Sequence, residues 1–200
     1  MGLRDDYEER FALLEQIKEE IKIRLIEIFD EVPRVDGISV RVKSIDKFLE
    51  KAGKIYGEND KPVYDYPLEE IQDQIGARVI VFYKSDVRLA TERILADFRE
   101  VENTQKEYPD PEGFSYEARH LICFLPEDVV TKHNPPIDFF ELQICTLFQH
   151  AWSEANHDLG YKPAEVLSFD DRRRIAWAAA QAWGADIIFD ELWNKNQKNN

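Results

Sequence analysis

Ionisable side chains gather in three short segments, each beside an apolar run. Residues 41–54 (RVKSIDKFLEKAGK) hold an excess of cations, and residues 73–81 (DQIGARVIV) begin with a carboxylate. Residues 139–146 (FFELQICT) place Glu141 and Gln143 among phenylalanine, leucine and isoleucine. Such groups either pack as structural polar residues or surround a charged ligand, and the residue types indicate which ligand they would suit.

The first segment suits a polyphosphate. Its five cations are Arg41, Lys43, Lys47, Lys51 and Lys54, in a chain whose formal net charge is −14. The four lysines share one face of a helix. Arginine grips phosphate with a planar fork and lysine binds it as a point charge. An ordinary solvated helix face has the same pattern, so both interpretations stay open at this point.

Asp73 and Glu141 are candidate metal ligands. Asp73 stands just before a predicted strand that has Arg78 near its start, and a carboxylate at a strand edge is a common Mg²⁺ ligand. A lone aspartate there more commonly ends or caps a helix. Because side chains alternate along a strand, Glu141, Gln143 and Cys145 share one face of the third segment. We expect that face to border a polar cleft.

The segment that follows, residues 146–160, is predicted to be a helix with one ionisable face. That face holds His150, Glu154, His157 and Asp158, with Tyr161 next in line. The HExxH zinc motif is absent. We therefore expect these side chains to support a neighbouring site by hydrogen bonding rather than to bind zinc.

Hydrophobic periodicity predicts the elements that position these groups. A long amphipathic helix is predicted over residues 5–30 and another over about 168–193. The other predicted helices cover 45–54, 68–76 (a turn), 85–99 (with Ser85 or Asp86 as N-cap) and 146–160. The predicted strands cover 38–44, 77–83, 116–126 and 137–145, and residues 55–66 and 101–114 are predicted loops. This order indicates one α+β or α/β domain over residues 1–200.

Composition limits the class of protein. Twelve Phe, 8 Tyr and 4 Trp can build a full core. The acidic balance argues against a broadly basic nucleic-acid coat protein, although one local basic patch remains compatible. Cys123 and Cys145 lack CxxC spacing, which favours structural thiols in a reducing compartment. We expect a cytoplasmic protein without membrane contact, because neither a membrane-spanning run nor a signal pattern is found.

Taken in order, the motifs resemble those of the RelA/SpoT family of alarmone synthetases. The matching segments are Arg-x-Lys with a trailing lysine (41–51), Asp-x-x-Gly-x-Arg (73–78), Tyr-x-x-x-His (116–120), Glu-x-Gln-x-x-Thr (141–146) and QHAWSEANHDLGYK (149–162). The resemblance covers roughly residues 36–162 and is closest to short members without a hydrolase domain. It implies an α+β, nucleotidyltransferase-like synthetase domain with a mixed sheet, flanked by the two long terminal helices.

The resemblance also implies an activity and residue roles. The family transfers the β,γ-pyrophosphate of ATP to a ribose 3′-hydroxyl, usually that of GDP or GTP, to make (p)ppGpp. Asp73 and Glu141 match the catalytic pair that organises Mg²⁺ and the acceptor hydroxyl. The ATP-binding cations would be Arg41, Lys43, Lys47, Lys51 and Arg78. Tyr116, which stacks on the acceptor base in the family, would form the acceptor site with His120 and Gln143.

Departures from the family pattern cluster on the acceptor side. Lys47 replaces the serine between the donor lysines, whereas Ser115, Ala118 and Cys145 replace a glycine, a serine and an arginine near the acceptor motifs. The Lys-Pro-x-Gly-Tyr lead-in to Tyr116 is missing. The sequence therefore predicts ATP as donor and leaves the acceptor open.

Two further hypotheses follow from these departures. One is a toxin of the same fold that pyrophosphorylates the 3′ end of tRNA and inhibits translation, with Lys47 and Lys54 on the acceptor stem. The other is an inactive nucleotide-binding module. The partners considered are ATP, GDP or GTP, tRNA, an antitoxin protein and a second copy of the chain.

Overall fold

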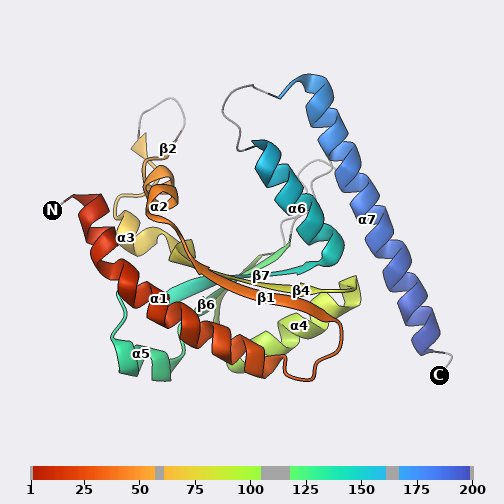
Figure 1. The fold of residues 1–200 in the computed structure, drawn as a ribbon, viewed down its shortest axis with the longest axis horizontal. Helices are drawn as coiled ribbons and strands as arrows, with labels where there is room; N and C mark the ends of the chain where they lie inside the picture. Colours follow the sequence, from red (N-terminus) through yellow and green to blue (C-terminus); the bar gives the residue numbers. More distant parts are fainter. Residues whose placement is uncertain (1, 57–60, 105–117, 161–166, 199–200) are drawn as a thin grey trace.

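The computed structural model describes residues 2–56, 61–104, 118–160 and 167–198. Over these residues the chain forms an α+β fold around a five-stranded mixed sheet with the order β1-β4-β7-β6-β5 (Figure 1). The strands are β1 (Val35–Val42), β4 (Ile75–Val81), β7 (Phe139–Thr146), β6 (Arg119–Phe124) and β5 (Glu100–Thr104). β4 and β7 pair in parallel, and the other neighbours pair antiparallel. Two short strands, β2 (Ile55–Tyr56) and β3 (Lys61–Pro62), pair separately.

Helices lie on both faces of the sheet. Figure 1 shows α1 (Leu3–Ile28), α4 (Lys84–Asp97) and α5 (Glu127–His133) on one side and α6 (Leu147–Gly160) on the other. Helix α7 (Phe169–Gln197) runs from beside α6 past the end of the sheet to the start of α4. Helix α2 (Ile45–Ala52) follows β1 directly, while α3 (Pro67–Glu70) and a 3₁₀ turn, η2 (Gln72–Gln74), precede β4. Within the described residues, none of the helices combines the length and apolarity needed to span a membrane.

The hydrophobic core lies between the sheet and α1 with α4. Helix α1 contributes a fully buried stripe, which consists of Leu14, Ile17, Ile21 and Leu25. Alternation along β4 buries Ile75, Ala77, Val79 and Val81 in the same core. The side chain of Arg78 therefore projects from the opposite face of the sheet, and this face carries the candidate site.

The mixed α+β sheet and the two long terminal helices are confirmed. Two details of the predicted elements are wrong. The predicted loop 101–114 begins inside β5 (Glu100–Thr104), an edge strand whose residues are all exposed, so no apolar alternation signals it. The N-cap of α4 is Tyr83, not Ser85 or Asp86. Asp86 is buried instead, where its carboxylate accepts three hydrogen bonds from Arg34.

Two smaller differences concern short elements. Helix α5 is not among the predicted elements, because seven residues are too few to show helical periodicity. The predicted loop 55–66 contains the paired strands β2 and β3. The rest of the predicted loop 101–114, from residue 105 onward, lies outside the described residues.

Candidate active site

The strand register places the candidate site residues in two adjacent rows across the sheet. Ser39 pairs with Arg78, Arg78 with Gln143, and Gln143 with His120. One step further along the strands, Arg41 pairs with Gly76 and Gly76 with Glu141. These residues come from segments far apart in the chain, and strand pairing alone places them side by side on the face turned away from α1 and α4.

Two adjoining cavities lie over these rows. One of about 240 Å³ is bordered by β1, β4, β7 and α6, and the other, of about 330 Å³, extends over the end of β1 and the start of α2. They share Arg41, Gly76 and Glu141. The smaller is also lined by Ser39, Ala77, Arg78, Gln143, His150 and Glu154, and the larger by Val42, Lys43, Ser44, Lys47, Asp73 and His157. Because they share a floor, the two cavities form one cleft.

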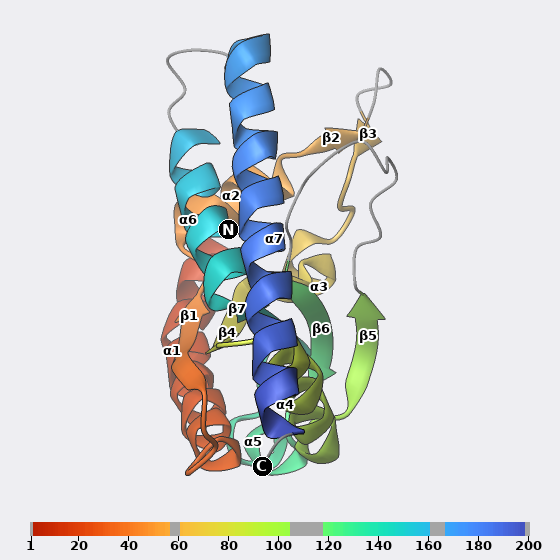
Figure 2. The same cartoon turned by 90° about the vertical axis from the view of Figure 1, so that its right-hand side faces the viewer.

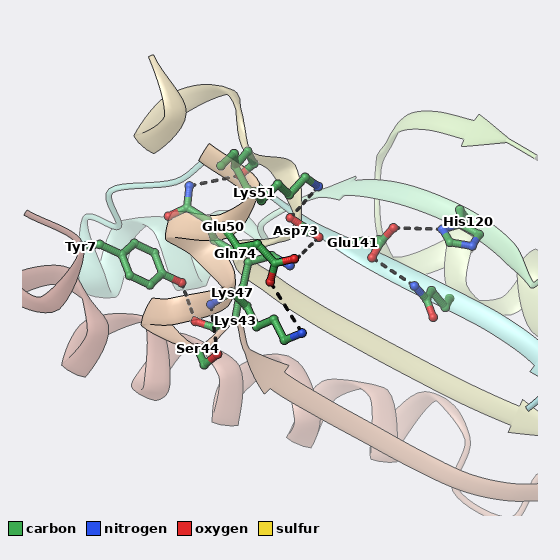
Figure 3. Close-up of polar contacts among 12 residues, drawn as sticks. Tyr7, Lys43, Ser44, Lys47, Glu50, Lys51, Asp73, Gln74, His120 and Glu141 are labelled. Atoms are coloured by element: carbon green, nitrogen blue, oxygen red, sulfur yellow. Dashed lines mark hydrogen bonds and ion pairs between the residues drawn. The ribbon is translucent and has the colours of Figure 1, made fainter. Parts of the chain in front are cut away.

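Asp73 is held between two lysines at one end of this cleft (Figure 3). Nζ of Lys43 lies 2.9 Å from Oδ2 of Asp73, and Nζ of Lys51 lies 3.0 Å from Oδ1. Burial raises the pKa of Asp73, but the hydrogen bonds and positive charges of Lys43 and Lys51 outweigh it, so the net pKa is lowered. For Lys51, burial lowers the pKa, but the hydrogen bond and charge of Asp73 with the charges of Tyr64 and Glu141 together outweigh it, so the net pKa is raised. The aspartate is therefore ionised and the lysine charged at neutral pH.

The backbone around this cluster is fixed by residues that carry no obvious chemical signal in the sequence. The Tyr7 hydroxyl on α1 donates to the Lys43 carbonyl at 2.8 Å, and the Tyr7 ring stacks on Phe48 of α2 at 3.9 Å. The Lys43 amide donates to the Gln74 carbonyl at 2.8 Å, next to Asp73. Helix α1 therefore helps to position Lys43. Hydrophobic periodicity alone would predict only a packing role for Tyr7.

Glu141 is the second carboxylate of the cleft, on the central strand β7. Its Oε1 lies 2.9 Å from Nδ1 of His120, and its Oε2 accepts from the Gln143 amide at 3.2 Å. Burial raises the pKa of Glu141, the hydrogen bond and charge of His120 lower it, and the charge of Asp73 raises it again; the net pKa is lowered. The opposing effect of Asp73 on this pKa indicates that the two carboxylates share one electrostatic environment.

Arg78 connects the strands to α6. Its Nε and Nη2 donate to Oε1 of Gln143 at 3.3 and 3.1 Å. Its Nη1 donates to Nδ1 of His150 at 3.1 Å and to Oε1 of Glu154. The hydrogen bond and charge of Arg78 lower the pKa of Glu154. The ionisable face of this helix therefore reaches the cleft by hydrogen bonds, as the spacing of its residues predicts.

The remaining predicted site residues occupy different positions. Arg41 and Lys47 line the cleft, whereas Lys54 is exposed, lies beyond the end of α2 and lines neither cavity. Tyr116 lies outside the described residues, so its role in the acceptor site stays a prediction. Cys145 is buried with its thiol 3.9 Å from the Val79 carbonyl, and burial raises its pKa to about 11. That environment is typical of a structural thiol.

Gly76 forms the shared floor between Arg41 and Glu141. A Cβ built at this position meets no atom within 4 Å. The absence of a side chain therefore leaves free space beside the carboxylate, where a ligand can approach the backbone closely. This glycine is part of the Asp-x-x-Gly-x-Arg motif, but the sequence alone does not reveal the open space above it.

The donor set fits Mg²⁺. This ion is usually bound through one or two carboxylates together with substrate phosphates and water. Asp73 and Glu141 supply two ionised carboxylates on the cleft, and the larger cavity leaves room above them. Among the described residues, no group of three or more His, Cys, Asp or Glu is arranged to hold a metal without a substrate.

A larger cavity, of about 510 Å³, lies elsewhere, between the end of α1, the start of β1 and α4. It is lined mostly by apolar side chains together with the Arg34–Asp86 ion pair. None of the predicted site residues borders it. Size therefore does not identify the functional site here, and the chemistry of the lining residues does.

Residues 40–166 match the family described as "Region found in RelA / SpoT proteins", and this chain belongs to that family. The solved small alarmone synthetase 1 from Bacillus subtilis is 26% identical with a TM-score of 0.76, over 97% of this chain and 99% of that one. The same protein bound to its product pppGpp gives 25% identity and a TM-score of 0.75, over 96% and 99%. A GTP pyrophosphokinase family protein from Streptococcus pneumoniae shares the fold, with 22% identity and a TM-score of 0.75, over 100% and 97%.

A comparison with curated proteins finds no match. The family match and the similar folds define a small alarmone synthetase-like member of the RelA/SpoT family, and thereby a pyrophosphotransferase.

Proposed function

We propose that this enzyme transfers the β,γ-pyrophosphate of ATP to the ribose 3′-hydroxyl of GDP or GTP and so makes (p)ppGpp. The observation that carries the proposal is the grouping of two ionised carboxylates, Asp73 and Glu141, with Arg41, Lys43 and Lys47 around one cleft. The relative from Bacillus subtilis, solved with pppGpp as its product, supports a guanosine acceptor.

The proposed reaction is a displacement at the β-phosphorus of ATP. The acceptor 3′-oxygen forms a bond to that phosphorus, the bond to the oxygen bridging the α- and β-phosphorus atoms breaks, and AMP leaves. Such transfers depend mainly on positioning and charge neutralisation. In this account Arg41, Lys43, Lys47, Lys51 and Arg78 hold the donor phosphates. Glu141 accepts the hydroxyl proton, and His120 and Gln143 keep its carboxylate in place on the acceptor side.

Mg²⁺ is the cofactor that this donor set suits, and Asp73 with Glu141 would hold it. When bound, the ion supplies positive charge to the phosphate oxygens. Asp73 is already balanced by Lys43 and Lys51. Lys43 and Lys51 would then be available to bind the phosphates of ATP, while Asp73 would be available to hold the ion.

The whole chain is proposed to act as one synthetase unit, residues 1–200. Helix α1 holds Lys43 through Tyr7, and α7 packs against α6, which contacts Arg78. ATP and guanosine nucleotides are cytoplasmic metabolites, and we propose that compartment as its place of work.

The test is an acceptor survey with the purified chain, Mg²⁺ and γ-labelled ATP. GDP, GTP, AMP, ATP and total tRNA are offered separately. The proposal predicts labelled guanosine tetra- or pentaphosphate with release of AMP. Label on tRNA without label on GDP or GTP would replace the proposal by the toxin hypothesis, for which an antitoxin partner would then be sought. No transfer to any acceptor would support the inactive-module hypothesis.

A further inference from the structure

Helix α7 buries an acidic side chain against the rest of the chain. Asp186 is 1% exposed, and Ala179 is the other buried residue of this helix. Figure 2 shows α7 side by side with α6, and the stacked rings of Phe148 and Phe189 join the two helices. Burial of a carboxylate is costly because it removes the water around the charge, so such a group is kept where it makes a specific hydrogen bond.

Asp186 contacts the hydroxyl group of Thr146, the last residue of β7. Oγ1 of Thr146 donates to Oδ2 of Asp186 at 2.5 Å, and Thr146 is fully buried. The same Oγ1 accepts from the backbone amide of Gln149 at 3.1 Å, and Oε1 of Gln149 accepts from the Thr146 amide at 2.8 Å. These two reciprocal hydrogen bonds cap the N-terminus of α6. A hydroxyl group has one proton, so its bond to Asp186 turns a lone pair toward Gln149.

The capped end of α6 lies directly before the side chains that hold Arg78. His150 follows Gln149 in the chain, and Glu154 lies about one turn further along α6. Nη1 of Arg78 donates to Nδ1 of His150 at 3.1 Å and to Oε1 of Glu154. The direction in which α6 leaves β7 therefore determines where these two acceptors hold the guanidinium group, which borders the cleft.

We propose that Asp186 is a positioning residue for pyrophosphate transfer. From α7 it orients the Thr146 hydroxyl, this hydroxyl caps α6, and α6 holds Arg78 where it binds the donor phosphates. The inference rests on the role proposed above for Arg78 at ATP. Asp186 itself touches no substrate, so its removal weakens the binding of the donor through a displaced Arg78.

The first test measures the Kd of the full chain for AMPCPP with Mg²⁺ by titration calorimetry. In this ATP analogue a methylene group replaces the oxygen whose bond the transfer breaks, so binding is measured without acceptor or turnover. We expect Asp186→Leu to raise the Kd about tenfold, the size of one lost hydrogen bond to a charged group. Asp186→Asn keeps an oxygen for the Thr146 hydroxyl and should stay close to wild type. Equal Kd values for Asp186→Leu and wild type overturn the proposal.

Asp190→Leu is the matched control on the same helix. Asp190 lies one turn after Asp186 and joins α7 to α4, because its Oδ1 accepts from the Ser85 amide at 2.8 Å. Loss of this contact should lower Tm and leave the Kd for AMPCPP unchanged, since α6 takes no part in it. If Asp190→Leu raises the Kd as much as Asp186→Leu does, a general loosening of α7 explains both effects and the positioning role is wrong.

Two substitutions of Thr146 carry the same test if Asp186→Leu does not fold. Thr146→Val keeps the shape of the side chain and removes the hydroxyl, so we expect a Kd about tenfold higher. Thr146→Ser keeps the hydroxyl and removes a buried methyl group, which should lower Tm and leave the Kd near that of wild type. A higher Kd in Thr146→Ser than in Thr146→Val would overturn the proposal, because affinity would then follow packing.

The deciding experiment asks whether Asp186 acts through Arg78. The Kd for AMPCPP is compared among wild type, Asp186→Leu, Arg78→Ala and the double variant. We expect Asp186→Leu to raise the Kd in the wild-type chain and to have no further effect once Arg78 is absent. An equal fold-change in both backgrounds overturns the inference and leaves the proposed function intact. A wild-type chain that binds no AMPCPP would instead overturn the proposed use of ATP, and this inference with it.

Discussion

The side-chain amide of Gln143 donates to Oε2 of Glu141 at 3.2 Å, and its carbonyl oxygen accepts from Arg78 at 3.1 and 3.3 Å. This amide can take only one orientation, since the reverse would aim its N–H groups at a guanidinium and its oxygen at a carboxylate. Gln143 thereby fixes Glu141 relative to Arg78, which α6 holds from the other side. The catalytic carboxylate of our proposal is oriented by neighbours on three strands.

Replacement of Gln143 by leucine should lower kcat about tenfold, the size expected for one lost hydrogen bond to a charged group. The KM for ATP should change less, because Arg78 loses its two hydrogen bonds to Gln143 but is still held by His150 and Glu154 on α6. Gln143→Glu should be worse, because it places a second carboxylate beside Glu141. Steady-state kinetics with both substrates varied checks this, and an unchanged kcat in both variants would remove Gln143 from the positioning of Glu141.

Asp73→Asn should destabilise the free protein by about 1–2 kcal/mol near neutral pH, because two lysines lose their ionic partner. The pKa of Asp73 is lowered by folding, so its charge stabilises the fold above the ordinary aspartate pKa. This contribution disappears as the pH falls through the lowered value. Urea unfolding of wild type and variant from pH 7 down to acid should therefore show a difference that closes at the acid end.

Asp46→Asn is the matched control for that titration. Asp46 pairs with Arg4 on the surface, and its side chain is 87% exposed. The same substitution there should change stability by no more than about 0.5 kcal/mol at any pH. A difference for Asp73→Asn that is equally large at acid and neutral pH would assign the effect to packing instead of charge.

Gly76→Ala should fold normally and lose activity. The added Cβ meets no protein atom within 4 Å, so Tm should not fall, whereas the methyl group takes up space between Arg41 and Glu141. We expect at least a tenfold loss of kcat/KM, since small misplacements of bound reactants are costly. Gly37→Ala, on β1 and outside the cleft, is the control. Full activity of Gly76→Ala would mean that no substrate approaches this floor.

Lys51→Ala and Lys54→Ala form a pair of identical substitutions three residues apart. Neither lysine lines the two cavities, but Nζ of Lys51 lies 3.0 Å from Oδ1 of Asp73, which does line the larger one. We expect the first to raise the KM for ATP about tenfold or more and the second to leave nucleotide kinetics unchanged. If tRNA is modified instead, Lys54→Ala together with Lys47→Ala should lower the salt slope of binding by about one unit for each lost phosphate contact. An unchanged KM for ATP in Lys51→Ala would exclude Lys51 from the donor site.

Much of this arrangement could be predicted from the sequence, for identifiable reasons. Long periodic patterns predict α1 and α7 to within a few residues, and strand alternation predicts that Glu141 and Gln143 share one face. The exposed edge strand β5 is not predicted, because no burial pattern marks it. The roles of Tyr7 and Gln74 could not be read from the sequence either. Both act through backbone hydrogen bonds to distant segments, which leave no local signature.

The site residues show the same division. Motif order grouped Asp73 with Lys43 and Lys51 as functional, yet only the folded chain shows that the lysines contact the aspartate directly. Cys145 lies on the same strand face as Glu141, as alternation predicts, but it is buried rather than in the cleft. Alternation along a strand predicts which residues share a face. The helices that pack on that face determine which of these residues remain accessible.

The most direct test of the central claim compares wild type with Glu141→Gln in transfer of label from γ-labelled ATP to GDP and GTP. Glutamine keeps the shape of Glu141 and its neighbours but removes the negative charge that would accept the hydroxyl proton. We predict that wild type makes labelled guanosine tetra- and pentaphosphate, and that the variant, still folded by circular dichroism, is slower by roughly 10²–10⁴-fold. Near-wild-type turnover by folded Glu141→Gln would contradict the account.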